Sequence, residues 1–173
     1  MTRRARSTAR PAAARRPLLF RHIMVPVDLS DRNERALRTA LELARERGGR
    51  TTLFHVIERV PGIAPGELGT FYQRLVESSE RRLRRTARKF AERGLDVRTE
   101  VRVGDPPAEI VRATLRERVD LVVMGSHKVR RGDRQRGWGT TSYKVGIFCQ
   151  CPILLDRKST RLNSSHLFTS RMP

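Results

Sequence analysis

Apolar and amphipathic segments alternate along residues 22–155 of this chain. Segment 22–28 is apolar almost throughout, as expected for a strand that is buried on both faces. Segment 95–103 alternates apolar and polar residues, which is typical of a half-exposed strand at a sheet edge. The pattern predicts strands at 22–28, 51–57, 95–103, 120–124 and 152–155, and helices from the caps Ser30 and Asp31 to Gly48 and at 69–93, 105–117 and 140–148.

This order of elements predicts an α/β protein with a single Rossmann-like domain. Strands that alternate with helices form an open, five-stranded parallel sheet with helices on both faces. In such a sheet, ligands bind beyond the carboxyl ends of the strands, where the strand order reverses. If the first and fourth strands are neighbours there, Asp28 and Gly125 face the same crevice.

The net charge of +19 over 173 residues first suggests a nucleic-acid partner. About half of the excess lies at the two ends: residues 1–21 carry seven Arg and no acid, and residues 156–173 carry four basic residues and one acid. The remaining segment, 22–155, has 26 basic and 17 acidic residues, a net charge of +9. A nucleic-acid partner therefore stays open but is not favoured.

The first 20 residues are mostly Arg, Ala, Pro, Ser and Thr, a composition that buries too little apolar surface to fold. We expect a disordered basic extension at 1–20 and a folded domain at 21–155. No apolar run approaches the roughly 18 residues of a membrane span, and 17–20 is too short for a signal-peptide core. The expected location is the cytoplasm, with no membrane partner.

The last 18 residues, 156–173, are predicted to be a non-native tail. Eleven consecutive residues, 156–166, match the conceptual translation of a common sequencing adapter, and 170–173 resemble the translation of a later part of the same adapter. Codons that differ from the adapter in the nucleotide record of the gene would exclude this origin. The two cysteines, Cys149 and Cys151, are one residue apart, so their side chains point to opposite faces of an extended segment. They make a poor disulfide framework and half a metal site at best, and they are expected to be small apolar residues entering the last strand.

The stretch from residue 120 to residue 155 is the most informative for function. Its apolar run ends in Met124-Gly125-Ser126, a polar loop follows, and the next helix begins with Thr140-Thr141-Ser142. Backbone N–H groups and a helix N-terminus at the carboxyl edge of a parallel sheet favour anions and nucleotides. The loop adds side chains suited to contacts with phosphate, namely His127, Lys128 and Arg130.

Several motifs together resemble the universal stress protein family over about residues 21–155. They are Ile23-Met-Val-Pro-Val-Asp28 with Ser30, Ala36-Leu37 with Ala40, Leu53-Phe-His-Val56, Gly104-Asp-Pro-Pro107, Asp120-Leu-Val-Val-Met-Gly-Ser126, Gly139-Thr-Thr-Ser142 and Cys151-Pro-Ile-Leu-Leu155. The resemblance implies the strand order 3-2-1-4-5 and a homodimer formed through the fifth strand. It also implies adenine nucleotide as the partner, because some members bind ATP, which Mg²⁺ can accompany.

ATP-binding members resemble the pattern Gly-x2-Gly-x9-Gly-Ser/Thr after the fourth strand. Gly125 matches the first glycine and Gly139-Thr140 matches the last pair, whereas Lys128 occupies the position of the middle glycine. The gap from Gly125 to Gly139 holds 13 residues, and the family pattern has 12.

By resemblance, Asp28 lies at the sugar or base, and Val56 offers backbone hydrogen bonds to adenine. The implied nucleotide-binding residues are Pro26, Val27, Asp28, Val56, Met124, Gly125, Ser126, His127, Lys128, Arg130, Gly139, Thr140, Thr141 and Ser142. Two alternatives stay open, because Asp28 and residues 140–142 are also suited to helix capping. His55 is expected to be a hydrogen-bonded core histidine.

The sequence contains no Gly-x4-Gly-Lys-Ser/Thr loop, dinucleotide fingerprint, nucleophile–base–acid set or metal-ligand spacing. We therefore expect a nucleotide-binding stress-response module, not an enzyme, with slow incidental ATP hydrolysis at most. The alternatives are a stress scaffold that does not bind ATP and a binder of nucleic acid or acidic partners.

Overall fold

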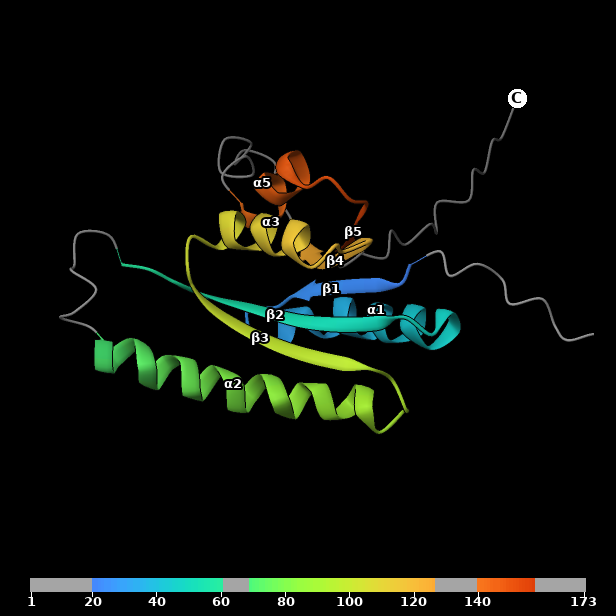
Figure 1. Ribbon diagram of the computed structural model, residues 1–173, viewed down its shortest axis with the longest axis horizontal. Coiled ribbons are helices and arrows are strands. Elements are labelled where there is room, and N and C mark those ends of the chain that lie inside the picture. Colours follow the sequence, from blue (N-terminus) through green and yellow to red (C-terminus); the bar gives the residue numbers. More distant parts are fainter. Residues whose placement is uncertain (1–19, 61–68, 127–139, 158–173) are drawn as a thin grey trace, which may run out of the picture.

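The computed structural model describes residues 20–60, 69–126 and 140–157. These residues form a five-stranded parallel sheet in the order β3-β2-β1-β4-β5, which confirms the predicted α/β fold (Figure 1). The strand order reverses between β1 and β4. The elements are β1 (His22–Pro26), η1 (Asp31–Asn33), α1 (Glu34–Arg47), β2 (Arg50–Glu58), α2 (Gly69–Ala91), β3 (Val97–Gly104), α3 (Pro106–Arg116), β4 (Leu121–Ser126), α5 (Thr141–Phe148) and β5 (Ile153–Arg157).

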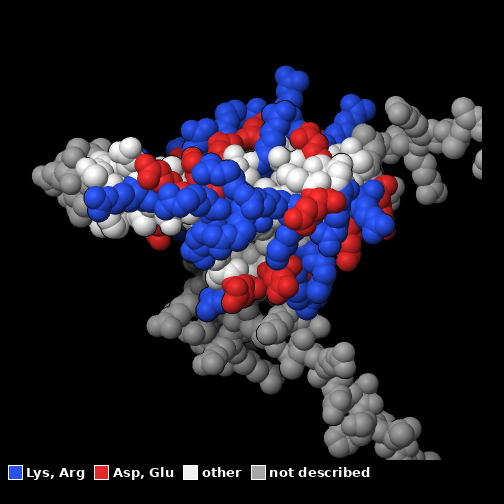
Figure 2. All heavy atoms as spheres, turned by 90° about the horizontal axis from the view of Figure 1, so that it is seen from below, with Lys and Arg blue, Asp and Glu red and all other residues white. Residues whose placement is uncertain are grey.

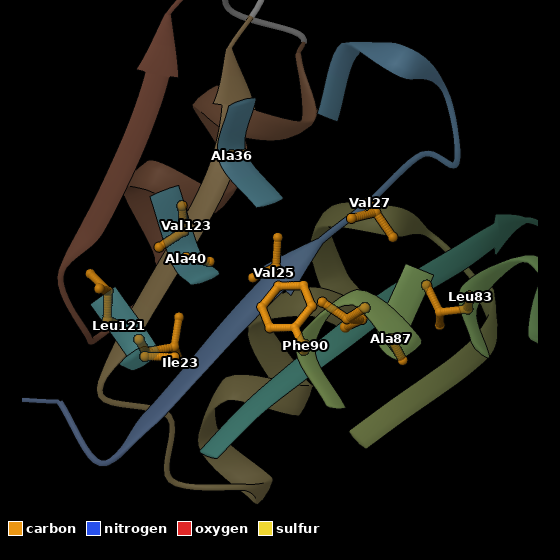
Figure 3. Packing of buried hydrophobic residues seen from close by; sticks show 12 residues of the cluster. Ile23, Val25, Val27, Ala36, Ala40, Leu83, Ala87, Phe90, Leu121 and Val123 are labelled. Atoms are coloured by element: carbon orange, nitrogen blue, oxygen red, sulfur yellow. The ribbon is translucent and has the colours of Figure 1, made fainter. Parts of the chain in front are cut away.

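The helices form two layers, with α1 and α2 on one face of the sheet and α3 and α5 on the other (Figure 1). On the first face, Ala36 of α1, Phe90 of α2 and Val25 of β1 belong to one buried apolar cluster, the first core layer (Figure 3). On the other face, Ile110 of α3 and Met24 of β1 belong to a second buried apolar cluster, the second core layer. Met24 and Val25 are both fully buried, as expected for a strand covered on both sides. None of the helices in the described ranges has the length and apolar character that a membrane crossing requires.

The ends of β1 and β5 bear on the predicted boundaries of the first strand and of the domain. β1 ends at Pro26, two residues before the predicted end, although Val27 N still donates to Phe54 O at 2.8 Å. β5 continues two residues past the expected domain end at 155, since Asp156 pairs with Gly125 and its carboxylate lies 3.1 Å from Arg35 Nη2. The adapter origin of the tail stays a prediction.

The structure corrects the expectation for the two cysteines. Cys149 caps the carboxyl end of α5, and β5 begins only at Ile153, so neither cysteine lies in the strand. The two sulfur atoms are 3.3 Å apart. Cys149 and Cys151 pack against the second core layer, as apolar residues do, but their sulfur atoms are also in contact with each other.

A buried polar network lies at the amino end of the sheet. The His22 imidazole shares a hydrogen bond of 2.8 Å between Nε2 and Thr52 Oγ1, and its Nδ1 lies 3.0 Å from Arg50 Nη2. The Glu117 carbonyl lies 3.1 Å from Nδ1, and the Glu117 carboxylate accepts from Thr52 Oγ1 at 3.4 Å. Burial lowers the pKa of His22 and is the largest cause of its shift. The hydrogen bond with the Glu117 carbonyl raises this pKa, the charge of Arg50 lowers it, and the charge of Asp120 raises it.

The lowered pKa of His22 predicts a loss of stability in mild acid. The unfolded chain binds a proton near pH 6.5 while the folded chain still holds a neutral imidazole, so the free energy of unfolding falls below that pH and levels off below the folded-state pKa. Urea unfolding of the wild type and His22→Gln between about pH 7.5 and pH 5 isolates the effect, because the surrounding charges are the same. Equal pH slopes in the two proteins would contradict this role.

Candidate functional site

A pocket of about 730 Å³ lies at the carboxyl ends of β1, β2 and β4, where the strand order reverses. The first two turns of α3 and the amino end of α5 complete its wall. The position is the one that an open parallel sheet predicts, and the volume is in the usual range of ligand sites. The lining residues are Pro26, Val27, Asp28, Asn33, Phe54, His55, Val56, Glu58, Pro106, Ile110, Met124, Gly125, Thr140, Thr141 and Ser142.

The structure brings nine of the predicted nucleotide-binding residues together in this pocket. They are Pro26, Val27, Asp28, Val56, Met124, Gly125, Thr140, Thr141 and Ser142. Ser126 is the last residue of β4. The other four predicted residues lie outside the described part of the chain, namely His127, Lys128, Arg130 and Gly139. Contact with a ligand stays a prediction for all of them.

Asp28 follows β1 and organises the turn that leads to α1. Its Oδ1 accepts hydrogen bonds from Ser30 N at 2.9 Å, from Ser30 Oγ at 2.6 Å and from Asn33 Nδ2. Ser30 is in turn the N-cap of η1 and accepts from Arg32 N at 3.3 Å. The helix cap considered as an alternative for Asp28 is therefore Ser30, whereas Asp28 binds the residues of the turn and also lines the pocket.

The turn after Asp28 contains a strained residue. Leu29 has φ 59°, in the left-handed region that branched side chains rarely adopt. Its carbonyl accepts from Arg82 Nη2 of α2 at 2.6 Å, and its side chain packs against the first core layer. The first core layer and α2 therefore hold the edge of the pocket in its conformation.

The amino end of α5 forms the opposite part of the wall. Thr140 is the N-cap, and its Oγ1 accepts from Tyr143 N at 3.3 Å, so the capping alternative is also present. The N–H groups of Thr141 and Ser142 belong to the first turn, which lacks acceptors within the helix. Together with the helix dipole, these groups favour an anion. Because no described Lys or Arg lines the pocket, this helix end is the positive element among the described lining residues.

Gly125 leaves the end of β4 open toward the pocket. A Cβ added there would lie 3.6 Å from Arg32 O and 3.7 Å from Asn33 Oδ1, which are ordinary van der Waals contacts. The packing of the described residues therefore does not require glycine at this position. A requirement for glycine would come from the close approach of a ligand to the backbone.

The pocket also contains residues that the sequence pattern did not indicate as site residues: Asn33, Phe54, His55, Glu58, Pro106 and Ile110. His55 is hydrogen-bonded as expected, since its Nδ1 lies 2.8 Å from Val27 O, but it is half-buried and lines the pocket. Its position beside Val56 at the carboxyl end of β2 was a usable signal. Ile110 had none, because only tertiary packing brings the second turn of α3 to this edge.

The fold and the pocket define an open α/β protein with a pocket at its topological switch point. The universal stress protein family matches residues 19–157, and the chain belongs to this family. It is 26% identical over 149 residues to universal stress protein YxiE of Bacillus subtilis, with 80% of this chain and 100% of that protein covered. It is 33% identical over 147 residues to the universal stress protein in the QAH/OAS sulfhydrylase 3′ region of Thermus aquaticus, with 80% and 100% covered.

Solved structures show the same fold. The hypothetical protein MJ0577 superposes with a TM-score of 0.71 at 24% identity, covering 82% of this chain and 99% of that one. A universal stress protein in complex with cAMP has a TM-score of 0.60 at 20% identity, covering 81% and 98%. The universal stress protein of Archaeoglobus fulgidus in complex with dAMP has a TM-score of 0.57 at 22% identity, covering 79% and 98%.

Proposed function

We propose that this universal stress protein binds adenine nucleotides, ATP among them, in the pocket between β1 and β4 and acts as a stress-response regulatory module without dedicated catalysis. One observation carries the proposal: a single pocket joins an apolar wall, the Asp28 carboxylate and the amino end of α5. The cAMP and dAMP bound by two family members support the same class of ligand. This function also fits the cytoplasmic location expected from the sequence.

The parts of an adenine nucleotide correspond to parts of the pocket. Phe54 and Ile110 provide apolar surface for the base, and the Val56 backbone offers hydrogen bonds to its edge. The Asp28 carboxylate suits the ribose hydroxyls, as acidic residues do in other nucleotide-binding α/β folds. The first turn of α5 suits a phosphate, and in the proposal Lys128 and Arg130 add positive charge to a polyphosphate.

Mg²⁺ would accompany ATP mainly through the phosphates in this proposal. Within residues 20–60, 69–126 and 140–157, no group of three His, Cys, Asp or Glu side chains is placed to hold a metal ion. Mg²⁺ commonly combines one or two carboxylates with phosphate oxygens and water, and Asp28 and Glu58 are the carboxylate residues among the described lining residues.

Isothermal titration of the full chain with AMP, ATP and ATP–Mg²⁺ at about 200 mM salt tests the proposal, with dissociation constants expected in the micromolar range. Gly125→Ala is expected to weaken binding by about 1–3 kcal/mol, the usual cost of forcing a methyl group into a close contact. Its free energy of unfolding should stay equal or rise by about 0.4–1 kcal/mol, because alanine restricts the unfolded chain.

The results for the wild type and for Gly125→Ala test different parts of this prediction. Absence of saturable binding of every adenine nucleotide to the wild-type protein would overturn the proposed function. Equal affinities of the wild type and Gly125→Ala would be compatible with nucleotide binding but would contradict a close approach of the nucleotide to Gly125.

A basic surface favours a second candidate function, the binding of nucleic acid. α2 carries seven Lys and Arg residues and two Glu residues, and Lys and Arg side chains cover much of the face seen from the α2 side (Figure 2). Arg82, Arg85 and Lys89 line a groove of about 350 Å³ beside η1. DNA binding that weakens steeply between about 50 and 200 mM salt, without nucleotide binding, would support this function in place of the first.

The exposed edge of β5 supports the homodimer expected from the family resemblance. In the described part of the chain, β5 pairs only with β4, so its outer edge has free backbone groups. Leu154 and Leu155 are 40% and 42% exposed, and Phe148 at the end of α5 is 65% exposed. An apolar edge with free backbone groups is suited to pairing with a second copy.

Leu154→Glu is expected to convert the dimer to a monomer, because it places a charge in the apolar edge. Multi-angle light scattering at micromolar concentration measures the mass. Leu115→Glu is the matched control, since this leucine of α3 is 52% exposed and lies away from β5, and its dimer should persist. A wild-type monomer, or a Leu154→Glu dimer, would exclude this interface.

A further inference from the structure

The two cysteines of the chain meet on the connector between α5 and β5. Cys149 is the C-cap of α5, with φ −74° and ψ 137°, and its N–H donates to Val145 O at 2.9 Å. Cys151 follows at a bend, two residues before β5. This turn brings the two sulfur atoms to 3.3 Å. Because the chain has only two cysteines, an intramolecular disulfide can form only between them.

A hydrogen bond holds the sulfur of Cys149, and both cysteines remain partly exposed to solvent. The Cys149 thiol donates to Thr114 Oγ1 of α3 at 3.6 Å, and the Thr114 hydroxyl donates to Val111 O at 2.8 Å. Both cysteines pack at the rim of the second core layer, and both are only partly buried. A disulfide needs about 2.0 Å between the sulfur atoms, so the pair must close by about 1.3 Å.

We propose that Cys149 and Cys151 form a dithiol redox site that reacts with low-molecular-weight disulfides, such as oxidised glutathione, to give a reversible intramolecular disulfide. The sulfur–sulfur contact, the bend that creates it and the partial exposure of both thiols carry the inference. In reducing compartments, disulfides of this kind are typically transient and act as redox sensors. The site lies where the helix that lines the pocket joins the edge strand.

Thiol–disulfide exchange proceeds in two steps. Burial and the neighbouring Cys149 sulfur raise the pKa of Cys151 to about 12, so the first attack comes from Cys149. The Cys149 thiolate bonds to one glutathione sulfur, the glutathione S–S bond breaks, and one glutathione thiol leaves with the Cys149 proton. The Cys151 thiolate then attacks Cys149 Sγ and releases the second glutathione, which takes the Cys151 proton. One glutathione disulfide is reduced to two thiols as the two protein thiols are oxidised.

Intact-mass spectrometry with thiol counting on the full chain tests the proposal. After treatment with oxidised glutathione, alkylatable thiols should fall from two to none, and the mass should fall by two hydrogen atoms with no glutathione retained. Reduced glutathione should restore both thiols. Retained glutathione on the wild type, a reducible covalent dimer or two unreacted thiols would each overturn the proposal.

The Cys151→Ser and Cys149→Ser variants identify the order of attack. Cys151→Ser should hold one glutathione at Cys149, because no second thiol can release it. Cys149→Ser should react much more slowly. Faster labelling of Cys149→Ser than of Cys151→Ser would overturn the assigned order. These readouts do not involve nucleotide binding, so their failure is distinct from failure of the proposed function.

Discussion

Replacing Phe90 with alanine is expected to lower the free energy of unfolding by about 3–5 kcal/mol, the usual cost of truncating a buried phenylalanine. Phe90 is 2% exposed near the end of α2 and packs in the first core layer with Val25 of the central strand and Ala87 one turn earlier (Figure 3). Alanine removes the ring and leaves a cavity between α2 and the sheet. Urea unfolding followed by circular dichroism measures the loss.

Phe71→Ala is the matched control for this prediction. Phe71 lies in the same helix but is 50% exposed, and its one aromatic contact among the described residues is an edge-on contact with Tyr72, at 5.7 Å between ring centres. Its truncation should cost less than about 1.5 kcal/mol. Losses of similar size in the two variants would show that α2 is not anchored to the sheet through Phe90.

Replacing two neighbouring threonines of β2 with valine is expected to change stability in opposite directions. Thr52 is 2% exposed, and its Oγ1 shares a hydrogen bond with His22 Nε2. Valine leaves Nε2 buried without that partner, whichever ring nitrogen carries the proton, at a cost of about 1–3 kcal/mol. Thr51 is fully buried, and its Oγ1 has no hydrogen-bond partner among the described residues, so valine should raise the free energy of unfolding by about 1 kcal/mol.

The two substitutions form a matched pair, because each replaces a threonine by a valine of nearly the same shape at neighbouring positions of β2. Thr51 and Thr52 are adjacent, both are buried, and valine matches threonine in volume. Thermal and urea unfolding of the two variants beside the wild type give the comparison. Stabilisation by Thr52→Val, or destabilisation by Thr51→Val, would contradict the hydrogen-bond assignments.

Most of the fold could be predicted from the sequence, because local patterns encode local structure. The apolar run at 22–28 and the alternation at 95–103 distinguish a central strand from an edge strand, and β1 and β3 occupy those places in the sheet. Gly48 ends α1 in the left-handed conformation that glycine favours. The rule that ligands bind where the strand order reverses predicted one crevice for Asp28 and Gly125, and both residues line the pocket.

The remaining parts of the site could not be read from the sequence. Phe54 and Ile110 carry the same apolar signal as any core residue, and only the packing of α3 against the sheet decides that they line the pocket. Asn33 carries no pattern that marks a site, and only the turn after β1 brings its side chain to Asp28. The cysteines were expected to enter the strand, and the bend before β5 brought their sulfur atoms together.

The sequence by itself determined the elements, their order, the parallel sheet and the family, because periodicity and turn residues act within a few positions of the chain. Only the tertiary structure decided which side chains share the pocket, which buried threonine has a partner and which thiols meet. Those relations join residues that are distant in the chain or separated by a bend. Their distances depend on how helices and strands pack, which no local pattern specifies.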